Sequence, residues 1–186
     1  MAKRRLARRE LPQFPIPSRW WGYRPVTPEL VVFVGLQGAG KSSFYRGRFA
    51  GTHDLVSKDR FPNNRNPARR QRQLIEEALA AGRSVVVDNT NPTPEDRAEL
   101  IALARPLGAT AVGYYFESRL AECLERNRQR QGKARVPDVA LYATRQRLCL
   151  PSPAEGFDRL YYVRLLGEGR FETLDWNEEL PDDEAR

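Results

Sequence analysis

The stretch VVFVGLQGAGKSS, Val31–Ser43, decides the fold predicted for this chain. It runs from an unbroken apolar string into three glycines, a lysine and two serines. Its second half fits the pattern G-x-x-x-x-G-K-[ST], with a predicted strand before it and a predicted helix after it. Glycines let successive backbone N–H groups point into one hollow, and the start of a helix adds positive potential. The stretch therefore predicts a loop that binds the phosphates of a nucleoside triphosphate.

This phosphate loop, a Walker A motif, supplies the predicted contacts to ATP. They are Gly35, Gln37, Gly38, Ala39, Gly40, Lys41, Ser42 and Ser43. We expect Lys41 to reach the outer phosphates as a catalytic residue and Ser42 to ligate Mg²⁺. ATP and Mg²⁺ are therefore the predicted cofactors.

Strands and helices alternate along the rest of the chain. We predict strands at 29–35, 54–59, 84–89, 110–117 and 159–166, and helices at 41–49, 68–82, 93–108, 118–132 and 138–150. At one helix start, Thr93 is the expected N-cap and Pro94 the first helical residue. Such alternation predicts an α/β fold, a five-stranded parallel sheet with helices on both faces.

The composition points to a polyanionic partner. Lysine and arginine number 31 against 24 acids, which gives a formal charge of +7 in 186 residues, and the acids crowd the C-terminal end. Basic patches attract polyanions, although a basic surface that only keeps the chain soluble is an equal alternative. We find no apolar run of the ~20 residues that would span a bilayer, and the two cysteines form no metal or redox pattern. We expect a reduced, cytoplasmic setting.

Two carboxylates follow predicted strands and are candidates for the phosphate-transfer site. Strand ends of a parallel sheet share one crevice with the phosphate loop. Asp88 closes the apolar run VVVD, as a Walker B aspartate does, and is the predicted second residue of the metal site. Asp59 follows LVSK among polar and basic residues and is the predicted general base. Either carboxylate could instead cap a helix or a turn. After Asp88, Asn89, Thr90 and Asn91 either line the crevice or only build its turn.

Arg126 and Arg130 stand four residues apart in a predicted helix after the fourth strand. Arginines at the edge of a phosphate site clamp the triphosphate and neutralise charge that develops during transfer. A solvated helix face is the alternative. The position after the fourth strand, where small kinases carry a lid, favours a catalytic lid.

From about Val31 to Leu166 the chain resembles the polynucleotide 5′-kinase family. The motifs DNTNP, 88–92, and PSPAEGF, 151–157, carry the resemblance, together with VSKD and RNRQR. It implies a stand-alone kinase without the D-x-D-x-T phosphatase module of the family. It also implies that Asp59 is the general base, that Arg126 and Arg130 are the lid arginines, and that Arg97 lies on the substrate side.

Two departures concern the acceptor. Lys58 stands where the family has an arginine, and Pro62 stands where the phage enzyme has an arginine that engages the substrate phosphate. We expect Arg60 or Arg65 to take that role, beside Thr90 and Arg97 as further substrate contacts.

The predicted function is transfer of the γ-phosphate of ATP to the 5′-hydroxyl end of DNA or RNA, as in nucleic-acid repair. One alternative is a kinase of a small metabolite or nucleoside. Another is an ATP-gated module that binds nucleic acid without phosphorylating it. The predicted partners are a nucleic acid with a 5′-hydroxyl end and ATP, with no membrane contact.

The chain divides into three expected segments. Residues 1–28 form a basic arm rich in proline and tryptophan, 29–167 the P-loop kinase domain, and 168–186 an acidic tail.

Overall fold

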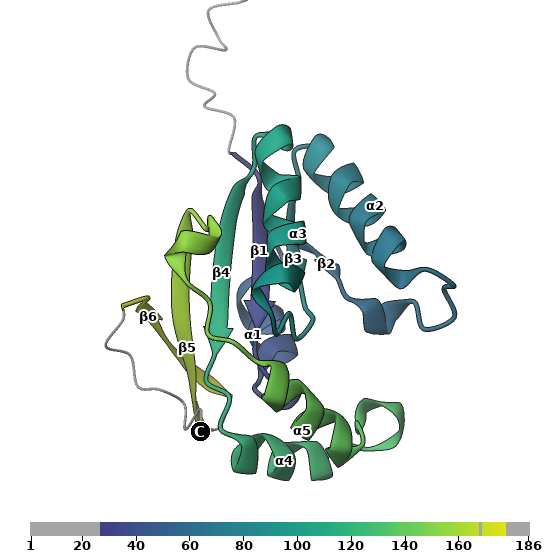
Figure 1. Ribbon diagram of the computed structural model, residues 1–186, viewed down its shortest axis with the longest axis vertical. Helices are drawn as coiled ribbons and strands as arrows, with labels where there is room; N and C mark the ends of the chain where they lie inside the picture. Colours follow the sequence, from purple (N-terminus) through teal and green to yellow (C-terminus); the bar gives the residue numbers. More distant parts are fainter. Residues whose placement is uncertain (1–26, 168, 178–186) are drawn as a thin grey trace, which may run out of the picture.

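A six-stranded sheet forms the centre of the molecule (Figure 1). The computed structural model describes residues 27–167 and 169–177. The strands are β1 (Glu29–Val34), β2 (His53–Val56), β3 (Ser84–Val87), β4 (Thr110–Phe116), β5 (Arg159–Gly167) and β6 (Arg170–Asp175). Their order is β2-β3-β1-β4-β5-β6, and all neighbours are parallel except the last pair, which is antiparallel.

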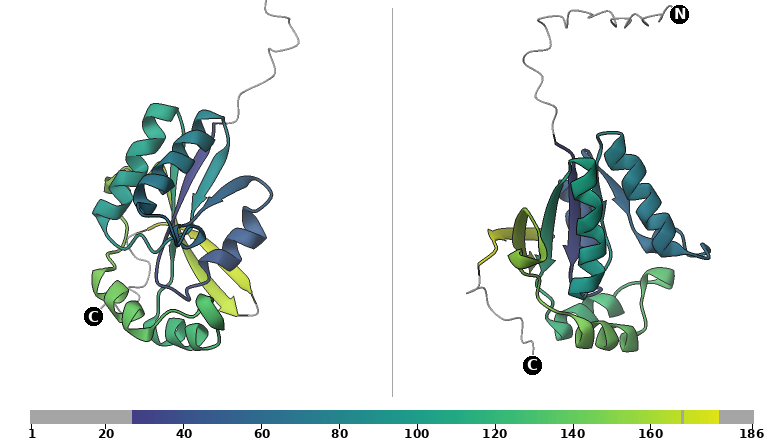
Figure 2. Two further views of the ribbon diagram at one scale, coloured as in Figure 1. Left: turned by 90° about the vertical axis from the view of Figure 1, so that its right-hand side faces the viewer. Right: turned by 45° about the horizontal axis from the view of Figure 1, so that its top comes forward.

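Five α-helices surround this sheet. They are α1 (Lys41–Arg48), α2 (Pro67–Ala80), α3 (Pro94–Ala104), α4 (Leu120–Arg128) and α5 (Asp138–Arg147). Helices α2 and α3 cover one face and α1 lies on the other, while α4 and α5 cross the carboxyl ends of the strands (Figures 1 and 2). The phosphate loop joins β1 to α1 at these same strand ends.

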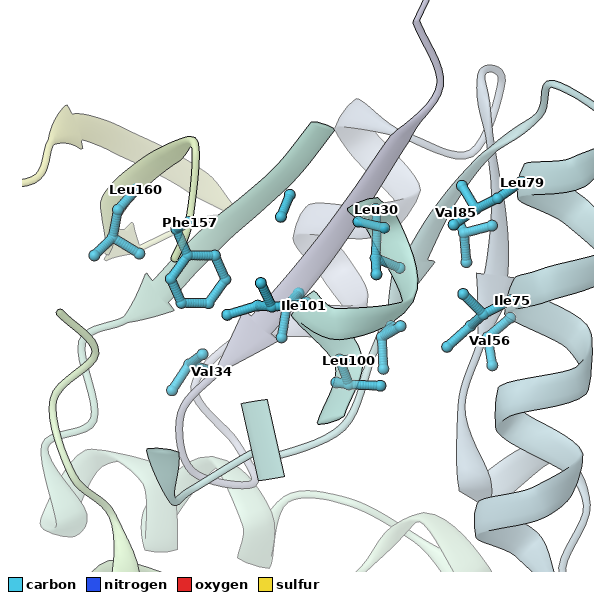
Figure 3. Close-up of a cluster of buried hydrophobic side chains, with 14 of the residues drawn as sticks. Leu30, Val34, Val56, Ile75, Leu79, Val85, Leu100, Ile101, Phe157 and Leu160 are labelled. Carbon is cyan, nitrogen blue, oxygen red and sulfur yellow. The ribbon is translucent and has the colours of Figure 1, made fainter. Parts of the chain in front are cut away.

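The central place of strand β1 in the sheet explains why residues 30–34 are all apolar. Leu30, Val32 and Val34 belong to the core under α2 and α3, whereas Val31 and Phe33 belong to the core under α1. Successive strand side chains point to opposite faces, so a central strand covered on both sides needs an apolar residue at each position. Figure 3 shows the first of these cores, in which Ile75 of α2 and Leu100 of α3 meet the sheet.

The predicted α/β class with five parallel strands is confirmed, with one strand added. Strand β6 lies in the segment that we expected to be an acidic tail, so that expectation is wrong for Arg170–Asp175. The expected N-terminal arm falls almost entirely on residues 1–26, outside the described part of the chain. Among the helices that the structure describes, none has the length and apolar character needed to cross a membrane.

Two element boundaries differ from the prediction and matter for the site. Strand β2 ends at Val56, so Asp59 lies in the short 3-10 turn Lys58–Arg60 that follows it. Helix α4 ends at Arg128, so Arg130 lies beyond the helix and does not share a helical face with Arg126.

Candidate active site

Lys41 lies at the first position of α1 and is buried within its own phosphate loop. Its Nζ donates hydrogen bonds to the carbonyl oxygens of Gly35, at 2.8 Å, and Leu36, at 2.6 Å. Burial of the ammonium lowers the pKa of Lys41 from 10.5 to about 8, and the nearby Asp88 carboxylate opposes this shift. The charges of Arg130 and Asp59 also act on the pKa of Lys41, more weakly than the charge of Asp88.

Two glycines of the loop are required by close packing. Gly38 has φ +86°, and a Cβ atom there would lie 2.6 Å from the carbonyl oxygen of Cys123 in α4. Gly40 has φ +97°, and a Cβ atom there would lie 3.0 Å from the ring of Phe171 in β6. The loop is thus held between α4 and the C-terminal strand, in a backbone conformation that other residues rarely adopt.

Ser42, in the first turn of α1, and Asp88, directly after β3, form the expected pair. Ser42 Oγ donates a hydrogen bond of 2.6 Å to Oδ2 of Asp88, whose side chain is largely buried. Mg²⁺ prefers hard oxygen ligands and is usually held by one or two protein groups together with water and substrate phosphates. The hydroxyl and the carboxylate fit such a site. Within the described residues, no cluster of three or more His, Cys, Asp or Glu side chains could hold a metal alone.

Asn89 connects the turn that carries Asp59 to helix α2. Its Oδ1 accepts a hydrogen bond of 3.0 Å from the backbone N–H of Lys58, and its Nδ2 donates one of 2.6 Å to Oε1 of Gln71 in α2. Asn89 directly follows Asp88 in sequence. The side chain of Asn89 therefore fixes the turn of the predicted base, Asp59, relative to the predicted metal ligand, Asp88. The side chain of Asp59 itself is exposed.

The residues after Asn89 build the turn that supports the phosphate loop. The carbonyl oxygen of Thr90 accepts a hydrogen bond of 3.0 Å from the N–H of Gly35. Asn91 has φ +42° and donates from Nδ2 to the carbonyl oxygen of Phe33 at 2.8 Å. Of the two interpretations left open by the sequence, turn building is the one these contacts support for Asn91, while a substrate contact from the side chain of Thr90 stays a prediction.

The two lid arginines differ in their surroundings. Arg126 Nε donates to the carbonyl oxygen of Gly38 at 2.7 Å, and its Nη1 lies 3.1 Å from Oε2 of Glu122. Arg126 therefore contacts the phosphate loop directly. Arg130 is half-buried, and its Nη1 lies 3.5 Å from the carbonyl oxygen of Ala134.

Arg97 has a position that contradicts the expected substrate contact. Its side chain is fully buried, and it forms a bidentate ion pair with Glu155 at 2.6 and 2.7 Å. Nη1 donates to the carbonyl oxygens of Asn91, Pro92 and Cys149. A guanidinium enclosed in this way is not available to a substrate phosphate. Arg97 instead links the two motifs, through its ion pair with Glu155 of PSPAEGF and its hydrogen bonds to the carbonyl oxygens of Asn91 and Pro92 of DNTNP.

Arg60 and Arg65, the two expected contacts of the acceptor phosphate, lie in different surroundings. The Nη1 of Arg60 lies 3.5 Å from the carbonyl oxygen of Leu55 in β2. Burial raises the pKa of Tyr45 in α1, and the charge of Arg60 opposes this shift. Arg65 is exposed in the loop before α2.

Two contacts of the phosphate loop were missed by the sequence analysis. Ser118 Oγ accepts from the N–H of Leu36 at 3.0 Å and donates to the carbonyl oxygen of Phe116. The side chain of Gln37 turns to α5, where Nε2 donates to Thr144 Oγ1 at 3.1 Å. A small polar residue two positions after the end of the apolar strand β4 was a signal for Ser118, whereas nothing local marks Thr144.

A family model described as AAA_33, AAA domain, matches residues 30–151. The chain belongs to this family. The match runs from β1 through the phosphate loop and the lid to the end of the segment that follows α5. With the geometry of Lys41, Ser42 and Asp88, it makes the chain a P-loop kinase domain that binds a nucleotide.

Two curated relatives are polynucleotide enzymes by name. A bifunctional polynucleotide phosphatase/kinase of Acanthamoeba polyphaga mimivirus is 27% identical over 150 residues, which cover 76% of this chain and 34% of the relative. One of Schizosaccharomyces pombe is 28% identical over 143 residues, covering 73% and 33%. The chain thus spans about a third of the length of these relatives. The resemblance to polynucleotide kinases is confirmed as a distant one.

Solved structures confirm the fold and include kinases of different substrates. Kti12 from Chaetomium thermophilum has a TM-score of 0.61 and 17% identity over 73% of this chain and 89% of that one. A gluconokinase from Sinorhizobium meliloti 1021 has a TM-score of 0.54 and 22% identity, and the match covers 76% of this chain and 85% of that one. A fungal RNA kinase has a TM-score of 0.59 and 18% identity, and the match covers 75% of this chain and 38% of that one. At these identities the likeness concerns the fold alone.

Proposed function

We propose that this chain is a polynucleotide kinase that moves the γ-phosphate of ATP to the 5′-hydroxyl end of DNA or RNA. One observation carries the proposal. The phosphate loop with Lys41 and the Ser42–Asp88 pair lies at the carboxyl ends of the strands (Figure 1), where the turn that carries Asp59 follows β2, inside the stretch that is similar to two polynucleotide phosphatase/kinases. The sequence similarity favours a nucleic-acid acceptor over the small acceptors that the same fold serves elsewhere.

In the proposed reaction each residue has a separate task. Lys41 and the backbone N–H groups of the loop hold the outer phosphates. Asp59 accepts the proton of the 5′-hydroxyl while the oxygen bonds to the γ-phosphorus and the bond to the β-phosphate oxygen breaks. Ser42 and Asp88 would hold Mg²⁺, which neutralises charge on the phosphates. Arg126 and Arg130 stabilise the charge that develops during transfer.

The decisive experiment supplies γ-labelled ATP and Mg²⁺ with matched 5′-hydroxyl DNA, RNA and nucleosides. We expect label on the oligonucleotide 5′ ends and little on free nucleosides. Asp59→Asn should retain ATP binding and lose transfer by orders of magnitude, because the amide accepts no proton. Label on nucleosides or sugars instead would support a small-acceptor kinase. Oligonucleotide binding that depends on ATP but gives no labelled product would support a binding module.

A further inference from the structure

The side chain of Gln37 links the phosphate loop to helix α5. Its Nε2 donates a hydrogen bond of 3.1 Å to Oγ1 of Thr144, 107 residues further along the chain. Thr144 Oγ1 in turn donates to the carbonyl oxygen of Ala140 at 2.8 Å. Because the hydroxyl hydrogen is used within α5, the hydroxyl oxygen acts as the acceptor toward Gln37. The amide of Gln37 is therefore oriented with Nε2 toward α5.

The other polar atom of this amide is left unpaired by the fold. Oε1 of Gln37 is buried, and no donor bonds to it in the part of the chain that the structure describes. An unpaired buried acceptor destabilises a fold, and it offsets the gain from the hydrogen bond on the other side of the amide. Gln37 thus adds little to stability, and residues that do not serve stability are expected at functional sites. The hydrogen bond to α5 is the contact through which Gln37 can act.

Helix α5 is attached to α4 through Asn127, whose side chain is fully buried. Its Nδ2 donates to the carbonyl oxygen of Val136 at 2.7 Å, and its Oδ1 accepts from the N–H of Val136 at 3.1 Å. Val136 lies two residues before the start of α5. In α4, Arg126 donates to the carbonyl oxygen of Gly38 in the phosphate loop. The position of α5 is therefore coupled to that of the arginine that contacts the loop.

The far end of α5 is fixed to the turn after β3. The N–H of Cys149, two residues beyond the helix, donates to the carbonyl oxygen of Pro92 at 2.9 Å. Between these two attachments, the hydrogen bond from Gln37 to Thr144 ties the helix itself to the phosphate loop. Helices α4 and α5 cross the carboxyl ends of the strands, where the phosphate loop lies (Figure 1).

We propose that the hydrogen bond between Gln37 and Thr144 is a latch that holds the lid helices α4 and α5 over the bound nucleotide. Thr144 is then a positioning residue, which acts through the lid and not on the reacting atoms. A closed lid retains the nucleotide and keeps water away from the γ-phosphate. This inference goes beyond the proposed function, because a latch needs a bound nucleotide and no particular acceptor.

Loss of the latch should favour hydrolysis over transfer. When the lid opens, a water oxygen can bond to the γ-phosphorus while the bond to the β-phosphate oxygen breaks, which gives ADP, inorganic phosphate and a proton. The ratio of ATP hydrolysed to phosphate transferred therefore reports the state of the lid. A residue that only supports the fold would change the amount of active protein and leave this ratio unchanged.

The test uses Thr144→Val, which has nearly the same shape and offers no acceptor to Gln37. Stopped-flow release of N-methylanthraniloyl-ADP and the ratio of hydrolysis to transfer onto a 5′-hydroxyl oligonucleotide are measured. Both should rise by about 3-fold to 10-fold, the range that one hydrogen bond provides. Thr144→Ser keeps the hydroxyl and should restore the wild-type values. Thr52→Val removes an exposed hydroxyl directly before β2, at the opposite end of the sheet, and should change neither quantity.

A double-mutant cycle with Gln37→Leu decides whether the two residues act together. If they form the latch, Thr144→Val has no further effect in the Gln37→Leu background, because the hydrogen bond is already absent. Destabilisation of α5 alone would appear in both backgrounds, so the cycle stays decisive even where the melting temperature falls. An equal effect of Thr144→Val with and without Gln37, or wild-type release and partition in Thr144→Val, would overturn the latch.

The outcomes also separate the latch from the proposed function. If the wild-type chain labels no oligonucleotide while Thr144→Val releases the ADP derivative faster only when Gln37 is present, the proposed function fails and the latch stands. If the wild-type chain labels oligonucleotides and Thr144→Val behaves as wild type, the kinase proposal stands and the latch is overturned.

Discussion

Arg97 and Glu155, 58 residues apart in sequence, form a bidentate ion pair in which the guanidinium is fully buried. The pair ties α3 to the segment before β5. Through Nη1 it also holds the carbonyl oxygens of Asn91 and Pro92, which follow directly on the turn that supports the phosphate loop. The geometry of the site therefore depends on the Arg97–Glu155 pair, although neither residue takes part in the proposed phosphate transfer.

Glu155→Ala should destabilise the fold strongly. The substitution leaves the guanidinium of Arg97 buried without its counter-charge, and loss of one partner of a buried pair costs about 3–5 kcal/mol. Urea unfolding of the variant would measure the loss. Arg83→Ala, which breaks the exposed pair with Asp54, should change the free energy of unfolding by about 1 kcal/mol or less. Equal effects of the two substitutions would contradict the structural role of Arg97.

The Arg97–Glu155 pair is a contact that the sequence alone does not predict. Nothing near Arg97 in sequence indicates that Glu155 takes up its charge, and the substrate role came from the resemblance to polynucleotide kinases. The start of α3 is the opposite case, because Thr93, Pro94 and Asp96 form a local signal, and the structure shows the predicted cap as a capping box. Local signals fix helix starts, whereas the partner of a buried charge depends on the folded chain.

Strand β6 was missed for a related reason. Its sequence alternates, with Phe171 packed on the core under α1 and Leu174 packed on the opposite core, together with Trp176 directly after the strand. The alternation was a usable strand signal. The surrounding acidic residues concealed it, and its pairing with β5 became visible only in the structure.

Gly38→Ala should damage the phosphate loop, whereas Gly47→Ala should not. A methyl group at position 38 would collide with the backbone of Cys123 and require a left-handed conformation. We expect the free energy of unfolding to fall by about 2 kcal/mol or more and the affinity for ATP to become much weaker. Gly47 is exposed within α1 with no atom near its Cβ direction, so alanine there should stabilise by about 0.5–1 kcal/mol. Thermal unfolding with and without ATP separates the two variants.

Asn89→Ala should lower the rate of transfer more than the affinity for ATP. Without the side chain, the turn that carries Asp59 loses the hydrogen bond from the N–H of Lys58 to Asn89, and the bond from Asn89 to Gln71 of α2 is lost as well. A base displaced by about 1 Å can lose on the order of 100-fold in rate. Single-turnover transfer and ATP titration measure the two quantities separately.

A matched control for Asn89 lies on α2. Gln73→Ala removes an exposed hydrogen bond to Glu77 and should leave the transfer rate unchanged. An Asn89→Ala variant that transfers phosphate at the wild-type rate would show that Asp59 does not depend on this bridge.

Nucleotide affinity should fall as the pH rises above about 8. Burial lowers the pKa of Lys41 to about 8, so the free protein loses its ammonium charge there, whereas bound phosphates keep the proton in place. The unfolded chain keeps this proton up to pH 10.5, so it binds more protons than the ligand-free fold between the two values, and the contribution of Lys41 to stability rises with pH in that window. Calorimetric titration with ATP from pH 7 to 9.5 should show proton uptake and an affinity loss approaching 10-fold per unit, as an order-of-magnitude limit. Lys41→Arg stays charged throughout, and an identical pH slope in that variant would assign the effect to another group.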